Sequence, residues 1–150
     1  IIEEIIETDS PNKSVQTQTE QYITPSTDRV RKYIDIEQRV YNYLSNTLDS
    51  KYKISQNMKA NSYRYDIVAE SNTDTIIYEI KYWKQRPPFR VYETLEKLKN
   101  SVESQNSIHH NFVFKLIIVS PSSDFINRFK SEDRLNIADN NIIYLLESDI

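Results

Sequence analysis

The stretch TIIYEIKYW, from Thr75 to Trp83, is typical of a β-strand, because β-branched and aromatic residues dominate it. It also contains two opposite charges. Side chains alternate between the two faces of a strand, so Glu79 and Lys81 point to the same face. Taken alone, this pair is explained by a solvated salt bridge on an exposed strand, so its meaning depends on the segments around it.

The predicted strand forms a hairpin with the strand before it. Two runs with the same alternation precede it, namely KYKISQNM (51–58) and SYRYDIVAE (62–70). The polar residues SNTD (71–74) separate the second run from Thr75 and have the length of a hairpin loop. A turn centred between Asn72 and Thr73 pairs Asp66 with Glu79, whether two or four residues form the loop. We therefore expect an antiparallel meander in which two carboxylates face each other.

Two opposed carboxylates indicate a metal site. Such a pair repels by about 0.2 to 1 kcal/mol when exposed and by more when buried, so a purely structural sheet tends to avoid it. A divalent cation between Asp66 and Glu79 turns this repulsion into a net attraction, and hard oxygen ligands suit Mg²⁺ or Mn²⁺. Lys81 lies about 7 Å beyond Glu79 on the same face, where its amine can contact an attacking water or a phosphate. The three residues predict a metal-dependent hydrolytic site.

A helix before the strands contributes a fourth candidate. Ser26, Thr27 and Asp28 are N-cap candidates for an amphipathic helix that continues to about Leu48. Its predicted apolar stripe consists of Val30, Tyr33, Ile34, Tyr41, Leu44 and Leu48. Glu37 falls in the middle of that stripe, where a solvated carboxylate is out of place. We expect Glu37 to reach the metal site directly or through water; alternatively, it extends to solvent from the helix edge or pairs with Arg64.

The remaining segments alternate between helix and strand. RPPFR (86–90) breaks the chain before a second amphipathic helix that ends near Ser107. FVFKLIIVS (112–120) is almost continuously apolar, as expected of a strand covered on both faces. A shorter helix (about 122–130) and a last strand (141–146) follow. The order α-β-β-β-α-β-α-β predicts an α/β domain with a mixed central sheet flanked by helices.

The chain divides into two parts. Residues 1–27 are rich in Ser, Thr and Gln and lack a sustained period, so we expect a flexible linker or the end of a preceding domain. Residues 28–150 suit one α/β domain. Because the first residue is isoleucine, we also expect other domains of a longer chain to accompany this one.

Composition excludes several classes of function. The 150 residues contain no glycine, which rules out P-loop and dinucleotide-binding loops, and no cysteine, which rules out disulfides and thiolate metal sites. No apolar run approaches the roughly 18 residues that span a bilayer. We therefore expect a soluble, cytoplasmic protein without a membrane partner. The net charge of -3 means that a nucleic acid would have to be held by a local basic patch or through metal ions.

The motif on these strands resembles a known nuclease signature. Tyr65 and Asp66 are followed by Glu79, Ile80 and Lys81 within the predicted α-β-β-β-α-β core. This constellation resembles the PD-(D/E)xK nuclease superfamily, which has the restriction-endonuclease-like fold, and the resemblance covers about residues 28 to 147. Tyr65 replaces the proline that names the motif, and the following helix has no Gln-x-x-x-Tyr signature that would point to the exonuclease branch.

The resemblance implies a role for each site residue. Asp66 and Glu79 would be metal ligands, the backbone carbonyl of Ile80 a further ligand, Lys81 the catalytic lysine and Glu37 the acidic residue of the first helix. The implied activity is a Mg²⁺- or Mn²⁺-dependent endonuclease that hydrolyses phosphodiester bonds in DNA. Many nucleases of this fold act as dimers, so a homo-oligomer is compatible with the resemblance, although the sequence marks no self-complementary surface.

A basic segment follows the motif. KYWKQRPPFR places Lys84, Arg86 and Arg90 around Trp83. We expect the three cations to hold the DNA backbone and the indole to stack on an unpaired base. The alternative for this segment is a solvated loop.

Two other functions stay open at this point. One is a catalytically inactive module of the same fold that binds nucleic acid or assembles with other domains. The other is an unrelated fold whose charged strand faces water.

Overall fold

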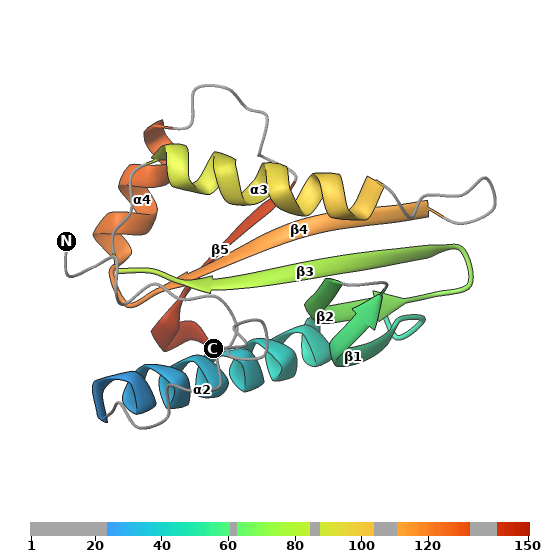
Figure 1. Cartoon of the computed structure of the whole chain (residues 1–150), viewed down its shortest axis with the longest axis horizontal. Coiled ribbons are helices and arrows are strands. Elements are labelled where there is room, and N and C mark those ends of the chain that lie inside the picture. The colour runs from blue at the N-terminus through green and yellow to red at the C-terminus, as the bar shows by residue number, and fades with distance from the viewer. Residues whose placement is uncertain (1–23, 61–62, 85–87, 104–110, 133–140) are drawn as a thin grey trace.

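The structure, a computed structural model, describes residues 24–60, 63–84, 88–103, 111–132 and 141–150. Three helices, five strands and a final 3₁₀ turn follow one another along this part of the chain (Figure 1). In order they are α2 (Thr24–Thr47), β1 (Lys53–Ala60), β2 (Tyr63–Glu70), β3 (Asp74–Tyr82), α3 (Pro88–Glu103), β4 (Asn111–Ser120), α4 (Ser123–Glu132), β5 (Ile142–Leu146) and η2 (Glu147–Asp149).

The five strands form one mixed sheet in the order β1-β2-β3-β4-β5. β1, β2 and β3 pair antiparallel, whereas β3, β4 and β5 pair parallel. Parallel neighbours need a crossover, and α3 and α4 provide it between β3 and β4 and between β4 and β5. Helix α2 lies on one side of the sheet and α3 and α4 on the other (Figure 1). The predicted α/β class with a mixed sheet is confirmed.

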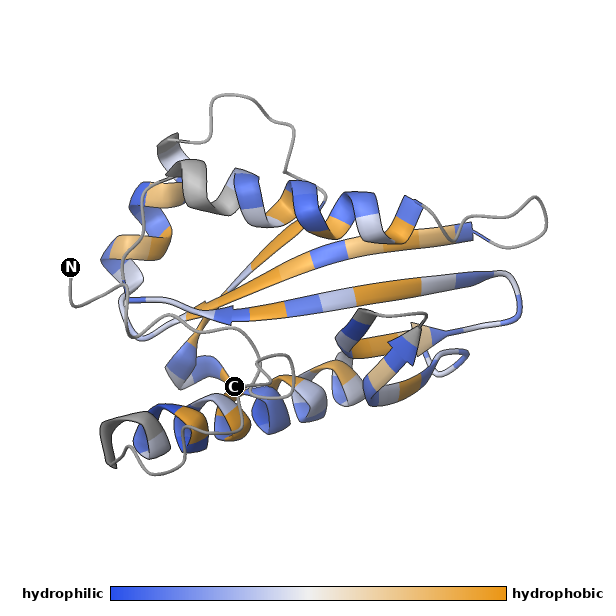
Figure 2. Ribbon diagram, viewed as in Figure 1, coloured by the Kyte–Doolittle hydropathy of each residue, from blue (hydrophilic) through white to orange (hydrophobic). Residues whose placement is uncertain are grey.

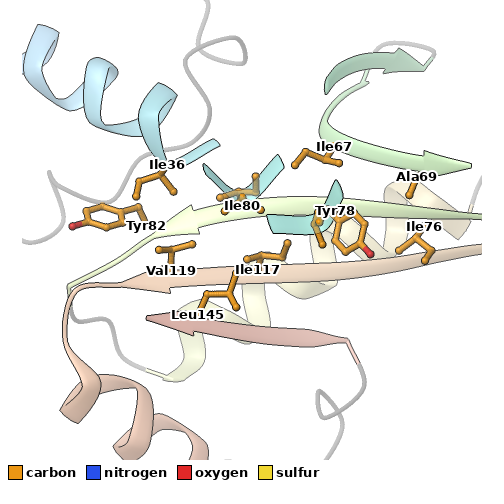
Figure 3. Packing of buried hydrophobic residues seen from close by; sticks show 12 residues of the cluster. Ile36, Ile67, Ala69, Ile76, Tyr78, Ile80, Tyr82, Ile117, Val119 and Leu145 are labelled. Carbon is orange, nitrogen blue, oxygen red and sulfur yellow. The ribbon is translucent and has the colours of Figure 1, made fainter. Parts of the chain in front are cut away.

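Each sheet face has its own core. Ile36, Val40 and Leu44 of α2 pack on one face, and Figure 3 shows Ile36 close to Ile80 and Tyr82 of β3. The other face is covered by the apolar sides of α3 and α4, which carry Leu95, Leu98, Val102, Phe125, Ile126 and Phe129. Figure 2 shows the hydrophilic residues of these helices on the sides turned away from the sheet. Consecutive residues of β3 therefore serve two different cores.

The hairpin register agrees with the prediction. Ile67 pairs with Tyr78, and the ladder continues to Glu70 opposite Thr75. The Ser71 amide closes the loop on the Asp74 carbonyl at 2.8 Å. The ladder ends at Ile67 and Tyr78, so Asp66 and Glu79, the next residues in this register, are not themselves a ladder pair.

The β2–β3 ladder ends well before β3 does. β3 pairs with β4 over all of Asp74–Tyr82, but its pairing with β2 stops at Tyr78. Within the described strands, nothing pairs with the other side of residues 79–82, which we call the open edge of β3. The site discussed below is built along this edge.

Helix α2 is turned slightly from the predicted orientation. Val30 and Ile34 are exposed, at 39% and 53%, so their assignment to the buried stripe is wrong. The buried side is formed instead by Tyr33, Ile36, Glu37, Val40 and Leu44. These residues follow i, i+3, i+4, i+7 and i+11 spacing, whereas Ile34 lies about 100° round the helix from Tyr33.

Two boundary predictions are affected by the start of α2. The helix begins at Thr24, so the predicted N-cap residues Ser26, Thr27 and Asp28 lie inside it. The predicted linker, residues 1–27, falls outside the described residues except for its last four, which are helical. Among the described helices, none combines the length and apolarity that crossing a membrane requires.

Candidate active site

Four charged side chains are buried in the described part of the chain. They are Glu37, Asp66, Glu79 and Lys81, with relative exposures of 5%, 2%, 6% and 4%. Charged residues are rarely buried to this degree, and a buried group of them is more common at functional sites than elsewhere. They come from α2, β2 and β3, and they are the four residues that the sequence pattern predicted for a catalytic site.

Two side chains meet the backbone of Ile80 at the open edge of β3. Asp66 Oδ2 accepts a hydrogen bond from the Ile80 amide nitrogen at 2.8 Å. The Tyr33 hydroxyl of α2 donates to the Ile80 carbonyl oxygen. A strand residue presents its N–H and C=O toward the same neighbouring strand. Asp66 and Tyr33 thus make the two bonds that β2 would make if the ladder continued.

Tyr65 fixes the end of β2 that carries Asp66. Its ring packs with Leu98 and Val102 of α3, and its hydroxyl is 3.2 Å from Ser101 Oγ. Tyr65 is thereby held against α3, whereas Ile67, two residues later, packs in the core on the α2 side. Side chains two apart on a regular strand share a face, so β2 departs from regular alternation at Asp66. Tyr65 occupies the position at which the motif that this sequence resembles has its proline.

The β1–β2 ladder is also irregular at Asp66. The pairing passes from Gln56 opposite Ile67 to Met58 opposite Tyr65, so Asn57 and Asp66 face each other outside the ladder. Asn57 has φ of 54°, in the left-handed region that asparagine tolerates better than most residues. Both ladders of β2 are therefore interrupted at the level of the candidate ligand.

Glu79 and Lys81 form a buried pair on one face of β3. Lys81 Nζ lies 4.0 Å from Glu79 Oε2, and the two side chains are only 5% and 8% exposed. The shared face is as predicted, but the alternative of a solvated salt bridge is wrong. Burial of an ion pair costs desolvation energy that a structural role on a sheet surface does not require.

Glu37 lies on α2, which packs on the sheet face opposite to the one that Glu79 and Lys81 share, because Ile80 belongs to the core under α2 whereas Ile77 and Trp83 belong to the cores under α3 and α4. Glu37 follows Tyr33 by four residues, so the two side chains lie on the same side of the helix one turn apart. Since Tyr33 contacts Ile80, that side of α2 faces the open edge. The alternative in which Glu37 extends to solvent does not hold, because the residue is 5% exposed.

The donor chemistry suits a hard divalent cation. One buried oxygen of each carboxylate, namely Glu37 Oε2, Asp66 Oδ1 and Glu79 Oε1, accepts no hydrogen bond from the described residues, although each side chain has other interactions. Within the described ranges, no three Asp, Glu or His side chains are gathered into a set that could hold a metal ion. Mg²⁺ commonly uses one or two carboxylates and completes its shell with water and substrate oxygens. Asp66 and Glu79 supply the two carboxylates, and the carbonyl of Ile80, the residue between Glu79 and Lys81 in the chain, is a further oxygen of the same chemical type.

The predicted role of Trp83 in nucleic-acid binding is wrong. It is 0% exposed and packs with Leu95, Leu116 and Phe125, so its ring cannot stack on an unpaired base. The reason is the alternation of side chains along β3. Trp83 is an even number of residues from Ile77, so both side chains point to the sheet face that α3 and α4 cover. Lys84, the next residue, is exposed.

Two further cations, Arg86 and Arg90, belong to the predicted basic patch. Arg86 lies outside the described residues, and so does the side chain of Arg90, although its backbone belongs to α3. Of the predicted basic patch, only Lys84 is therefore placed at the surface.

Tyr33 is a site residue that the sequence did not reveal. Its position in the apolar stripe predicted packing only, and the pattern contains nothing that says where a buried hydroxyl points. Its spacing of four residues from Glu37 was the one available signal.

The sequence matches no protein-family model and no curated protein. Function is therefore inferred from the geometry of the site.

Proposed function

We propose that this chain is a Mg²⁺- or Mn²⁺-dependent nuclease domain of the restriction-endonuclease-like fold, which hydrolyses phosphodiester bonds in DNA. The observation that carries the proposal is that the buried charged residues among those described are the four catalytic candidates, Glu37, Asp66, Glu79 and Lys81. They are contributed by three elements that meet near the open edge of β3. We further propose that the domain acts as an endonuclease in the cytoplasm.

Each residue has a defined task in this proposal. Asp66 and Glu79 would hold the cation, the Ile80 carbonyl would provide a further oxygen, and Glu37 would act through water. When bound, the cation supplies charge stabilisation at the phosphate and lowers the pKa of a water molecule. Lys81 Nζ, 4.0 Å from Glu79 Oε2, orients the attacking water as an ammonium group, or accepts the proton of that water where it is the neutral amine. Burial keeps these charges in an environment where their interactions are strong.

The substrate contact lies after the motif. The net charge of -3 gives no general attraction to a polyanion, so binding depends on local cations. Lys84 is exposed three residues after Lys81, and Arg86 and Arg90 follow it in sequence. We assign these cations to the phosphate backbone, which they would hold without reading sequence.

Cleavage assays test the proposal with a matched control. Plasmid and single-stranded DNA are incubated with the wild-type chain, Asp66→Asn, Glu79→Gln or Glu70→Gln, in Mn²⁺, Mg²⁺ or EDTA. Glu70 is an exposed carboxylate at the far end of β2, so its variant should cleave like wild type. Loss of either site carboxylate should reduce cleavage by about 100-fold or more, since removal of a mere outer-shell partner of a metal ligand already costs 10- to 100-fold. Cleavage that survives both site substitutions would overturn the assigned site.

A second candidate function is supported by one observation. Lys84 is exposed just after the motif, as expected for a catalytically inactive module that keeps the fold for nucleic-acid binding. DNA binding by the wild-type chain without cleavage in Mn²⁺ would select this function over the first.

A further inference from the structure

The geometry points to Tyr33 as a positioning residue for the metal site, acting through the backbone carbonyl of Ile80. This inference rests on the proposed function, because it concerns the carbonyl that lies between the two motif residues Glu79 and Lys81. Tyr33 itself touches neither the cation nor the substrate. Its hydroxyl would set the direction in which the Ile80 oxygen faces the ion.

Both peptide groups that flank the Ile80 α-carbon are held by side chains. Asp66 Oδ2 accepts the N–H at 2.8 Å, and the Tyr33 hydroxyl binds the C=O. A carbonyl oxygen has two lone pairs, so a bond to Tyr33 leaves one for a cation. On an open strand edge, water would otherwise bond this oxygen from variable directions. Tyr33 replaces it with a donor from a fixed position.

The hydroxyl can act in this way because its ring and its helix are held. The Tyr33 ring is 2% exposed, so packing determines where the oxygen lies. The residue before it, Lys32, contacts the Glu147 carboxylate, and Arg39 Nη2 donates to the Glu147 carbonyl at 2.7 Å. Two cations of α2, Lys32 and Arg39, thus hold the helix segment around Tyr33 to the η2 turn.

The neighbouring tyrosine provides a matched control. Tyr82 is a buried tyrosine on the same side of β3, and its hydroxyl also donates one hydrogen bond, but to Glu147. Tyr33→Phe and Tyr82→Phe each remove one buried hydroxyl and keep the ring. Only Tyr33→Phe removes the donor from the Ile80 carbonyl.

A single NMR signal reports on this carbonyl. Ile80 and Lys81 form the only Ile-Lys step in the 150 residues. Labelling with carbonyl-¹³C isoleucine and ¹⁵N lysine therefore isolates the Ile80 carbonyl in a carbonyl-to-amide correlation spectrum. The signal is recorded for the wild-type chain and both variants in EDTA and during titration with Mg²⁺, and no DNA is present.

The expected result has two parts. In EDTA, the Ile80 carbonyl carbon should shift upfield in Tyr33→Phe, because a hydrogen bond has been lost, and should not shift in Tyr82→Phe. On titration, Mg²⁺ should move the signal in the wild-type chain, with about tenfold weaker affinity in Tyr33→Phe, the lower end of the loss that follows removal of an outer-shell partner. Tyr82→Phe should retain the wild-type affinity.

Three results would overturn the inference. Equal Mg²⁺ affinity in Tyr33→Phe and the wild-type chain would exclude a positioning role. Failure of Tyr33→Phe to fold, judged by its amide spectrum, would show that the hydroxyl serves the fold. An Ile80 signal that Mg²⁺ leaves unmoved, while the cleavage assay still depends on Asp66 and Glu79, would exclude the carbonyl as a ligand without touching the proposed function. If the wild-type chain binds no metal and cleaves no DNA, both proposals fail together.

Discussion

The carboxylate of Asp66 is bonded to the amide nitrogen of Ile80, 14 residues later in the chain and one residue past the acidic position of the motif. The 2.8 Å bond fixes one carboxylate oxygen against the backbone of β3. An asparagine at this position can still accept the same bond through its side-chain oxygen. Charge can therefore be removed from Asp66 while its contact with β3 is kept, which makes Asp66→Asn the most informative single substitution in the site.

Metal binding should stabilise the fold through Asp66. A ligand that binds only the folded state at 100 times its Kd adds about 2.7 kcal/mol to the free energy of unfolding. For a chain of this size that corresponds to a rise in Tm of roughly 5–10 °C. Thermal unfolding of the wild-type chain and Glu70→Gln should show the rise in excess Mn²⁺ over EDTA, and Asp66→Asn should lose most of it. Equal rises in all three proteins would contradict the assigned ligand.

Lys81 should be needed for cleavage but not for metal binding. Replacing it by methionine keeps the buried stem and removes the amine that is 4.0 Å from Glu79. Single-turnover cleavage should fall by about 10²- to 10⁴-fold, the usual contribution of a positioned proton-transfer group. Stabilisation by Mn²⁺ should remain. Lys53→Met, at an exposed lysine of β1, is the control, and a Lys81→Met protein that cleaves as fast as this control would argue against a catalytic lysine.

Lys84 should contribute to DNA affinity without sequence preference. A single phosphate contact contributes about one unit to the slope of log K against log salt concentration. Anisotropy titrations of labelled DNA in EDTA, at several salt concentrations, should therefore show a slope lower by about 1 for Lys84→Ala than for the wild-type chain. An unchanged slope would place the DNA elsewhere on the surface.

Acid should destabilise the protein through Glu147. Burial alone would raise the pKa of this carboxyl, but hydrogen bonds from Lys32, Tyr82 and Arg39, and the charge of Lys32, lower it below its ordinary value of 4.5. A carboxyl whose pKa is lower in the folded state stabilises the fold above its unfolded pKa, and this stabilisation is lost as the pH falls through the folded pKa.

Denaturant unfolding between neutral pH and about pH 3 checks this expectation. The free energy of unfolding should decline below about pH 4.5 in the wild-type chain. Glu147→Gln should be less stable at neutral pH and should show a shallower decline. Parallel curves for the two proteins would mean that other carboxyls govern acid unfolding.

The hairpin and the buried helix glutamate are the parts of the site that sequence could predict. Loop symmetry sets the register, and the Ile67–Tyr78 pair agrees with it. Helical periodicity places Glu37 on the buried side, and it is 5% exposed. Both follow from repeats that the backbone imposes on every side chain.

The contacts of Tyr33 and Tyr65 could not be predicted in the same way. Where a strand ladder stops depends on which side chains pack beyond it, and Tyr65 packs on α3, an element that comes more than 20 residues later. The direction of a buried hydroxyl likewise depends on tertiary packing. Trp83 is different, because strand parity already indicated a core position that its basic neighbours obscured.

The open edge of β3 has a consequence for solubility. An unpaired strand edge is a template on which a strand from a second molecule can add, and this is a common start of aggregation. At Ile80 the two groups that such a strand would use are already bonded to Asp66 and Tyr33. Asp66 and Tyr33 therefore also prevent intermolecular strand pairing at Ile80. A variant that lacks both the Asp66 carboxylate and the Tyr33 hydroxyl would gain a new site of self-association.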